Sequence, residues 1–283
     1  SILAEEQEFY SQFKKVLADE NIEIKELTLT KDIWCRDFMP VKSANGLNLL
    51  FNYDPYYLKG KYSEKKTTRE NIIKMLNSLG IQFDDIQDIK IDGGNVIKTS
   101  DKVILTDMIY KENCINPKDK NEQNMLIGKL EDHFQSTIII VPYQPGDYLG
   151  HADGIVRFLD EDTVLVNSFS SVRDKRLEDS KSFLDRFFGA LGASGLNTVQ
   201  VPYSPVFGKG KDKMPLAYGI YINYLETSSH IFLPQFEEEF EEMDSQALTR
   251  FSELFSSKGK KVVPVNARQI AYGGGVLNCI TWN

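Results

Sequence analysis

The stretch TVLVNSFSSVRDKRLEDSKSFLDRFFGALGASGLNTVQVP, residues 163–202, is the clearest copy of a pattern that recurs along this chain. The apolar run at Thr163–Asn167 predicts a buried strand, and apolar periodicity over 176–191 predicts a helix that closes at Gly192. A second strand is predicted at Thr198–Pro202. Strands that alternate with helices in this way are typical of an α/β fold.

The same strand–helix–strand order appears on both sides of this stretch. A helix at 3–18 and a strand-like run at Ile22–Leu27 come first. Further helices are predicted at 68–79, closed by Gly80, and at 121–133 and 243–257. Further strands are predicted at Leu47–Tyr53, in a segment that ends at Ile91, and at Val103–Thr106, Thr137–Pro142, His230–Pro234 and Lys261–Pro264.

A polar segment follows each of the later predicted strands, and the regular spacing of these segments favours a ring of units. We mark each segment by one residue: Asp37, Asp92, His151, Asn223 and Cys279. Successive marker residues lie about 55–60 residues apart, except for one longer step. The longer step contains Tyr203–Pro215, which we interpret as an inserted loop. Five units closed around an axis would bring these segments together. A doubly wound sheet fits the order of elements equally well, so the repeat alone leaves both folds open.

Composition narrows the classes of partner. The chain has 33 Lys and Arg against 41 Asp and Glu, a net charge of −8, which argues against nucleic acid and mildly favours a cationic ligand. No apolar run approaches the roughly 18 residues of a membrane helix, so we expect no membrane segment and a soluble, cytoplasmic protein, with export after signal removal left open. Three cysteines without a CxxC or Cys/His spacing predict neither a disulfide framework nor a metal site.

Two residues could carry nucleophilic and acid–base chemistry. Cys279 follows Gly273–Gly275, where glycine lets a substrate approach the backbone closely, although a buried cysteine in a strand is the alternative. His151 lies in a Gly-His-Ala-Asp-Gly segment. If this segment is extended, His151 and Asp153 share one face and can address one ligand together. A structural histidine is the alternative.

The remaining candidates are carboxylates. Asp92 precedes Gly93 and Gly94 at a predicted strand end, and Asp37 follows Trp34 closely. Either aspartate alone could be a turn former. Together with Asp153 they suit a planar guanidinium, whose fixed fork of N–H donors pairs with carboxylates. A cysteine amidase or protease is disfavoured, because its developing oxyanion needs donors rather than acids.

These segments resemble a known family. Trp34-Cys35-Arg36-Asp37, Asp92-Gly93-Gly94-Asn95, Gly150-His151-Ala152-Asp153 and the run from Gly273 to Cys279 resemble the bacterial agmatine deiminase and bacterial-type peptidylarginine deiminase family of the guanidino-modifying (pentein) superfamily. The resemblance implies a five-bladed α/β propeller of ββαβ units with pseudo-five-fold symmetry. It also implies one catalytic domain over residues 1–283.

The resemblance assigns roles to individual residues. Cys279 is similar to the family's nucleophile, His151 to its general acid/base and Asp92 to its catalytic acidic residue. Asp153 and Asp37 then hold the substrate. Asn223 matches a substrate-side asparagine, and Trp34 matches a wall of the slot, with plain core packing as the alternative.

The implied reaction is hydrolysis of agmatine to N-carbamoylputrescine and ammonia, through a covalent thiouronium on cysteine and without metal or organic cofactor. Deimination of peptidyl or free arginine to citrulline is the main alternative, and an amidinotransferase or a catalytically silent binder are others. The chain departs from the family in having Asn278 where histidine is common and Asp92 where glutamate is common. The loops expected to set specificity are Asp54–Lys66, Glu112–Asp119 and Tyr203–Pro215, and the oligomeric state is open.

Overall fold

The structure is a computed structural model that describes residues 33–55, 60–169, 181–210 and 214–282. The helix expected at 3–18 and the strand-like run at 22–27 lie outside these residues. The described chain is a mixed α/β protein, as the repeat predicts, and its strands form four sheets of three strands each.

All four sheets have one topology. A short first strand pairs antiparallel with the second, a helix follows, and the third strand pairs parallel with the second. The sheets consist of β1 Val41–Lys42, β2 Asn48–Asn52 and β3 Asp84–Lys90; β4 Ile97–Lys98, β5 Lys102–Thr106 and β6 Thr137–Val141; β7 Val156–Phe158, β8 Thr163–Asn167 and β9 Asn197–Val201; and β10 Leu225–Glu226, β11 His230–Gln235 and β12 Lys261–Asn266. Each sheet with its helix is therefore a ββαβ unit.

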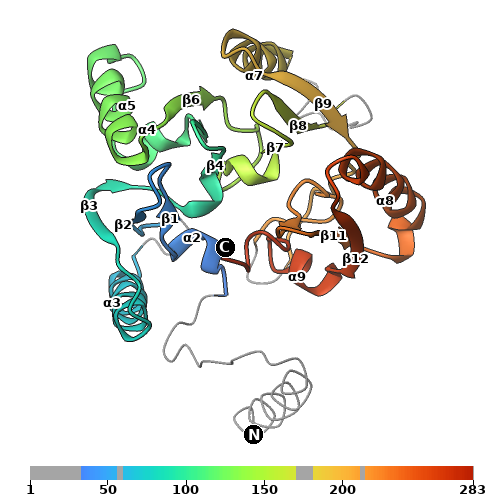
Figure 1. Cartoon of the computed structure of the whole chain (residues 1–283), viewed down its shortest axis with the longest axis horizontal. Coiled ribbons are helices and arrows are strands. Elements are labelled where there is room, and N and C mark those ends of the chain that lie inside the picture. Colours follow the sequence, from blue (N-terminus) through green and yellow to red (C-terminus); the bar gives the residue numbers. More distant parts are fainter. Residues whose placement is uncertain (1–32, 56–59, 170–180, 211–213, 283) are drawn as a thin grey trace, which may run out of the picture.

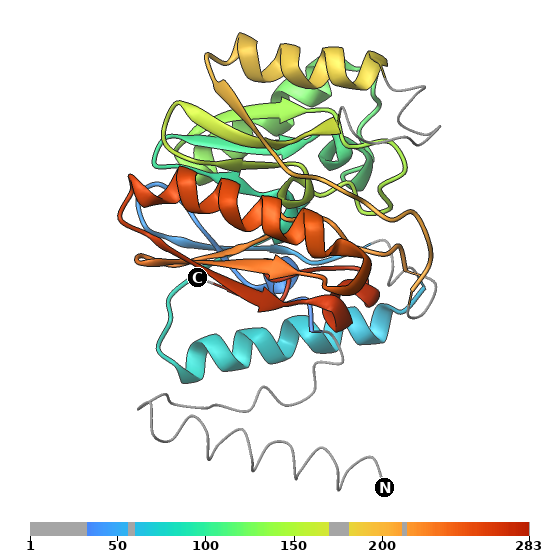
Figure 2. The ribbon, with the colours of Figure 1, turned by 90° about the vertical axis from the view of Figure 1, so that its right-hand side faces the viewer.

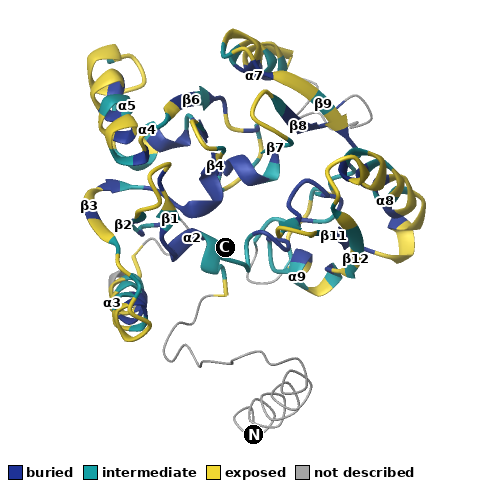
Figure 3. Ribbon diagram, in the orientation of Figure 1, coloured by how far each residue is buried: buried dark blue, intermediate teal, exposed yellow. Residues whose placement is uncertain are grey.

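The connecting helices are α3 Tyr62–Ser78, α5 Lys120–Phe134, α7 Lys181–Ala193 and α8 Glu241–Ser256. They lie at the periphery in Figure 1, whereas the short first strands β1, β4 and β7 lie toward the middle. Figure 2 shows the helices from the side, on the outside of their sheets. Figure 3 shows that burial follows this order, because the outward faces of these helices are exposed and the inner segments are buried.

The helices pack through residues spaced four apart. Phe183, Phe187 and Leu191 of α7 are all buried, and so are Phe251 and Phe255 of α8. A spacing of four places these side chains on one stripe of the helix. The stripe of α7 packs in one apolar cluster with strands of its own unit and of the preceding unit, so neighbouring units share their cores.

Smaller elements connect the units to the middle. These are α2 Cys35–Phe38, α4 Met108–Glu112, α9 Arg268–Tyr272 and the 3₁₀ turns η2 Gly93–Asn95, η3 Ala152–Gly154 and η6 Glu238–Phe240. Among the described helices, none is long and apolar enough to cross a membrane.

Two predicted helix boundaries are wrong. Helix α3 begins at Tyr62, six residues before the expected start, so it takes up part of the loop predicted at Asp54–Lys66. Gly192 lies inside α7, and Gly195 closes that helix with a φ of +74°. Glycine adopts this left-handed conformation without strain, and the backbone N–H of Leu196 then donates to Leu191. Gly80, with a φ of +68°, closes α3 as predicted.

Candidate functional site

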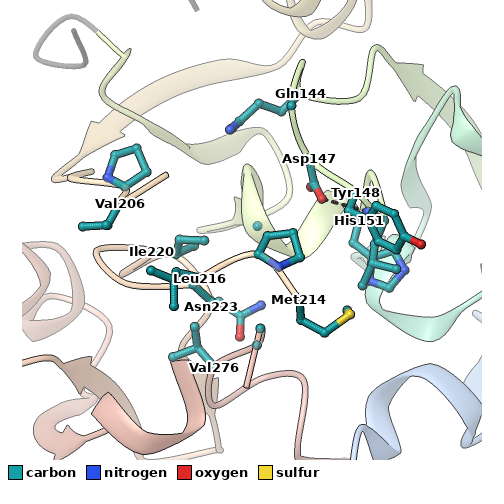
Figure 4. A pocket seen from close by; sticks show the side chains of 18 of the residues that line it. Gln144, Asp147, Tyr148, His151, Val206, Met214, Leu216, Ile220, Asn223 and Val276 are labelled. Atoms are coloured by element: carbon teal, nitrogen blue, oxygen red, sulfur yellow. Dashed lines mark hydrogen bonds between the residues drawn. The ribbon is translucent and has the colours of Figure 1, made fainter. Parts of the chain in front are cut away.

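A cavity of about 510 Å³ opens beside the middle of the molecule, and four predicted site residues line it. They are His151, Asp153, Asn223 and Cys279. Figure 4 shows Asp147, Tyr148 and His151 gathered on one side of this cavity, and Ile220, Asn223 and Val276 on the other. Segments far apart in sequence therefore meet at one site.

At the wall of the cavity, His151 lies between two buried aspartates. Its Nδ1 is 3.7 Å from Asp37 Oδ1, and its Nε2 is 3.5 Å from Asp92 Oδ2. All three side chains are less than a tenth exposed. The structure thus brings together the three residues that the sequence placed in separate repeats, although Asp37 and Asp92 are not among the described residues that line the cavity.

The two glycines after Asp92 make this approach possible. A Cβ on Gly94 would lie 2.5 Å from His151 Nδ1 and 2.8 Å from Asp37 Oδ1, and a Cβ on Gly93 would lie 2.0 Å from the carbonyl oxygen of Arg36. The backbone N–H of Gly94 also donates to Asp37 Oδ1 at 3.1 Å. Any side chain here would displace the imidazole and its carboxylate, so η2 packs closely against α2.

A second group of contacts surrounds Cys279. Asn278 Nδ2 donates to Asp153 Oδ2 at 2.7 Å, and the Asn278 backbone N–H donates to Asn223 Oδ1 at 3.1 Å. The Cys279 thiol lies 3.4 Å from Asn223 Oδ1 and 3.8 Å from Asp153 Oδ2. Cys279 sits in a turn rather than in the strand of the alternative interpretation.

The expected extended face of His151 and Asp153 is wrong in detail. His151 has extended backbone, but Asp153 lies in η3, and the strand begins only at Val156. The two side chains nevertheless serve one site from two sides, since His151 faces Asp37 and Asp92 while Asp153 faces Cys279. The 3₁₀ turn, not strand alternation, produces this arrangement.

The histidine is held in its charged form. Burial by itself would lower the pKa of His151, but the facing carboxylates of Asp37 and Asp92 outweigh burial and raise that pKa well above its usual value. Burial also raises the pKa of Asp37 to about 8, with Asp92 and Asp153 adding repulsion and His151 opposing it. The site therefore holds an imidazolium among carboxyl groups.

The neighbouring carboxylates keep His151 charged, but they keep Cys279 in its neutral form. Burial, together with the carboxylates of Asp153 and Asp37, raises the pKa of Cys279 well above its usual value. Its thiol therefore stays protonated at neutral pH, because burial and a facing carboxylate both disfavour the thiolate. Cys114 is exposed, and burial raises the pKa of Cys35 to about 11.

Trp34 packs against the glycine run instead of the described cavity lining. A Cβ on Gly275 would lie 2.4 Å from the Trp34 ring, and one on Gly273 would lie 3.6 Å from it. The indole thus lies on the backbone of the segment that leads to Cys279. This close approach explains why glycine is required there.

Sequence reasoning missed two acidic residues near the site. Asp147 lines the cavity, and its carboxylate accepts from the backbone N–H of Leu149 at 3.0 Å. Glu112 ends α4, and burial raises the pKa of its carboxyl to about 8, with Asp92 adding repulsion. Glu112 was expected only as part of a loop, and Asp147 stands four residues before His151 without a recognisable motif.

The inserted loop contributes to the cavity as well. Tyr203, Val206 and Lys209 line the cavity, as does Met214. Lys211 and Lys213, which could meet a substrate carboxylate, lie outside the described residues. The loop expected at Glu112–Asp119 is shorter at its start, because Glu112 belongs to α4, and Asp119 caps α5 by accepting from two backbone N–H groups.

Comparison with known families and proteins identifies the relatives of this chain. The family model described as Porphyromonas-type peptidyl-arginine deiminase matches residues 1–283. A Selenomonas ruminantium protein provisionally named agmatine deiminase is 25% identical over 281 residues, which cover 89% of this chain and 74% of that protein. The agmatine deiminase of Pseudomonas putida is 20% identical, over 96% of this chain and 79% of its own length.

Solved structures show the same fold. The agmatine deiminase of Enterococcus faecalis superposes with a TM-score of 0.66 at 21% identity, over 87% of this chain and 73% of its own. The C. jejuni agmatine deiminase gives a TM-score of 0.67 at 17% identity, over 87% of this chain and 71% of its own. The α/β arrangement of ββαβ units is therefore shared with these enzymes.

Proposed function

Because this chain belongs to the Porphyromonas-type peptidyl-arginine deiminase family, we propose that Cys279, His151 and the surrounding carboxylates hydrolyse the guanidino group of agmatine. Membership makes the chain a hydrolase that acts on the C–N bonds of amidines. The agmatine deiminase names of its relatives support a small guanidino substrate.

One observation carries the proposal: a thiol and an imidazole share a buried site with an excess of carboxylates. Asp153 Oδ2 lies 3.8 Å from Cys279 Sγ, so a guanidinium held by Asp153 would present its central carbon near the sulfur. The bound cation would also offset the negative charge that keeps the thiol protonated. Substrate binding therefore favours the thiolate at the moment when it is needed.

The first half of the reaction releases ammonia. On substrate binding the Cys279 thiol loses its proton to solvent, and the resulting thiolate attacks the central carbon of the guanidinium and forms a C–S bond. His151, already an imidazolium, donates its proton to a terminal nitrogen, and the C–N bond to that nitrogen breaks. Ammonia leaves, and a thiouronium on Cys279 remains.

The second half regenerates the enzyme. The neutral imidazole of His151 takes a proton from water, and the hydroxide attacks the thiouronium carbon. The C–S bond then breaks, the hydroxyl proton passes to the departing sulfur, and a carbamoyl product and the Cys279 thiol form. Asp92 and Asp37 stabilise the imidazolium form of His151 at both stages. All steps use side chains and water, so the proposal requires neither metal nor organic cofactor.

Two lining residues bear on the rest of the substrate. Asp147 provides a second acidic group in the cavity, which suits the distal amine of agmatine. Lys209 lines the same cavity and suits the carboxylate of free arginine, which makes free arginine the second candidate. We place agmatine first because relatives of this chain are named agmatine deiminases and because Asp147, on the same side of the cavity as His151 (Figure 4), adds to its acidic lining.

The proposed fold is a five-bladed propeller in one domain over residues 1–283. Four ββαβ units are described, and polar segments from five positions along the chain supply the site. The helix and strand predicted at 3–27, together with the segment that leads to Cys279, would supply the fifth unit.

The test is ammonia release from agmatine, free arginine and an arginine-containing peptide. We expect agmatine to give the highest kcat/KM and Cys279→Ala to lower it by at least about 10³-fold. Cys114→Ala is the matched control, since Cys114 is exposed, and it should retain full activity. Lack of activity on every guanidino compound, or activity retained by Cys279→Ala, would refute the proposal.

A further inference from the structure

A second cavity, of about 410 Å³, lies on the side of the ring away from the catalytic cavity. Inner strand β4 begins just after η2, next to His151, and runs away from it toward the turn at Thr99 and Ser100. That turn lines the second cavity, together with residues of β1, β7 and β10. The cavity is therefore the far mouth of the space enclosed by the inner strands.

The lining of this mouth is cationic, although the whole chain has a net charge of −8. Lys42 of β1, Lys98 of β4 and Arg157 of β7 occur in three successive inner strands, and Arg36 adds a fourth cation. Glu226 of β10 is the acidic residue among the described residues that line it. The repeated unit thus places three positive groups around one opening, and Arg36 of α2 brings the number to four.

Glu226 does not neutralise these cations by itself. Its Oε1 is 2.7 Å from Nζ of Lys260, which does not line the cavity, whereas its Oε2 is 3.8 Å from Arg157. Within the part of the chain that the structure describes, neither Lys42 nor Lys98 makes an ion pair. Partial enclosure and the neighbouring charge of Lys42 lower the pKa of Lys98, and burial and Arg157 lower that of Arg36.

We propose that this far mouth binds a small multivalent oxyanion of the phosphate type. Guanidinium groups pair with phosphate oxygens in a fixed fork, and lysines add compact positive charge, so the lining matches such a ligand and disfavours a cationic substrate. A phosphate would relieve the repulsion between Lys42 and Lys98. A cavity of 410 Å³ admits phosphate itself or a small phosphorylated compound.

The site would adjoin the catalytic backbone without containing catalytic side chains. Arg36 Nε donates to the carbonyl oxygen of Asn278 at 3.3 Å. The backbone N–H of Arg36 donates to the carbonyl oxygen of Cys279 at 3.1 Å. An anion on the Arg36 guanidinium would thus lie behind the segment that carries the nucleophile. The inference rests on the second cavity and its charges, and not on the proposed deiminase activity.

Titration calorimetry with inorganic phosphate, at constant ionic strength set by chloride, tests the proposal. The wild-type chain should bind phosphate, and the double variant Lys42→Ala/Lys98→Ala should bind it at least about tenfold more weakly, because two charge-assisted contacts are lost. Lys118→Ala/Lys261→Ala is the matched control, since both lysines are exposed and lie away from the cavity lining. This control should bind phosphate as the wild type does.

Absence of phosphate binding by the wild-type chain at millimolar concentration would overturn the proposal. Equal weakening in both double variants would overturn it as well, because it would mean a general effect of net charge. Because binding is measured directly, these outcomes do not depend on whether agmatine is the substrate.

Discussion

Asp153 interacts with two groups that belong to different parts of the reaction. Its Oδ2 accepts from Asn278 Nδ2 and also lies 3.8 Å from the Cys279 thiol. Together with burial, the carboxylate that would bind a cationic substrate therefore keeps the nucleophile protonated. This coupling links substrate binding to activation of the sulfur.

Removing that charge should expose the coupling. In Asp153→Asn the pKa of Cys279 should fall, so alkylation of Cys279 by iodoacetamide at pH 8 should be about three- to tenfold faster than in the wild type. Mass spectrometry of the alkylated peptides gives the rate. Cys114 provides an internal control, because it is exposed and its rate should not change. An unchanged or slower rate at Cys279 would show that Asp153 does not set its protonation.

Asn278 acts through Asp153 and Asn223, so it is a positioning residue. In Asn278→Ala the 2.7 Å hydrogen bond to Asp153 is lost, and kcat/KM for the guanidino substrate should fall about tenfold. We expect most of the loss in KM, because the carboxylate that holds the cation becomes mobile while the imidazole is untouched. Steady-state kinetics of ammonia release separates the two constants, and an unchanged KM would contradict this assignment.

At the level of elements, the site depends on the close approach of η2 to α2. Gly94→Ala would place a methyl group 2.5 Å from His151 Nδ1, so we expect activity to fall by about 10²-fold through a displaced imidazole. Gly128→Ala in α5 is the control, since its Cβ meets no atom within 4 Å and alanine favours a helix. Ammonia release by both variants measures their activity, and thermal unfolding shows whether each variant is still folded. A fully active Gly94→Ala would mean that η2 does not position His151.

The longer helices and strands could be predicted from the sequence, because each buries a stripe or a continuous run of apolar side chains. Strand β8 was predicted at its observed bounds, Thr163–Asn167, since its five residues form one apolar run. The inner strands β1, β4 and β10 have two residues each, and two residues carry no periodicity. They form because the preceding site segment and the following hairpin turn hold them beside a long strand.

Side-chain environments were harder to predict than elements. The acidic stretch 235–244 has the composition of a solvated helix face, yet Asp244 is buried. It accepts from the backbone N–H groups of Phe236 and Glu237 and from the Tyr221 hydroxyl. Sequence separates these partners by up to 23 residues, so no local pattern could reveal them.

The same reasoning explains the site. Glycine runs and polar segments at matched positions in the repeat indicated His151, Asp92 and Cys279, because such segments suit no core. Asp147 and Glu112 carry no motif, and only the folded chain brings them near the others. The pairing of Asn278 with Asp153 spans 125 positions and could not be deduced from spacing.

At the scale of the whole molecule, closing the units around the middle has an electrostatic cost. The ends of the described chain meet there, since Trp282 Nε1 donates to the carbonyl oxygen of Pro40 at 2.7 Å. Burial raises the pKa of the enclosed Glu112 carboxyl group to about 8. This value lies above that of an unfolded chain, so the folded state binds more protons between about pH 4.5 and 8.

The sign of the pH dependence follows from this difference. The contribution of the protonated Glu112 carboxyl group to folding stability is fully present below its pKa in the unfolded chain. It is lost as the pH rises through the folded-state pKa of about 8. Glu112→Gln keeps the neutral form at every pH. Its melting temperature should therefore equal that of the wild type near pH 4 and exceed it by roughly 2–4 °C or more at pH 8. Glu161→Gln removes an exposed carboxylate and should show no such divergence. The same melting-temperature difference between wild type and Glu112→Gln at both pH values would mean that Glu112 is ionised in the folded protein. The enclosed site would then tolerate one more negative charge than its geometry suggests.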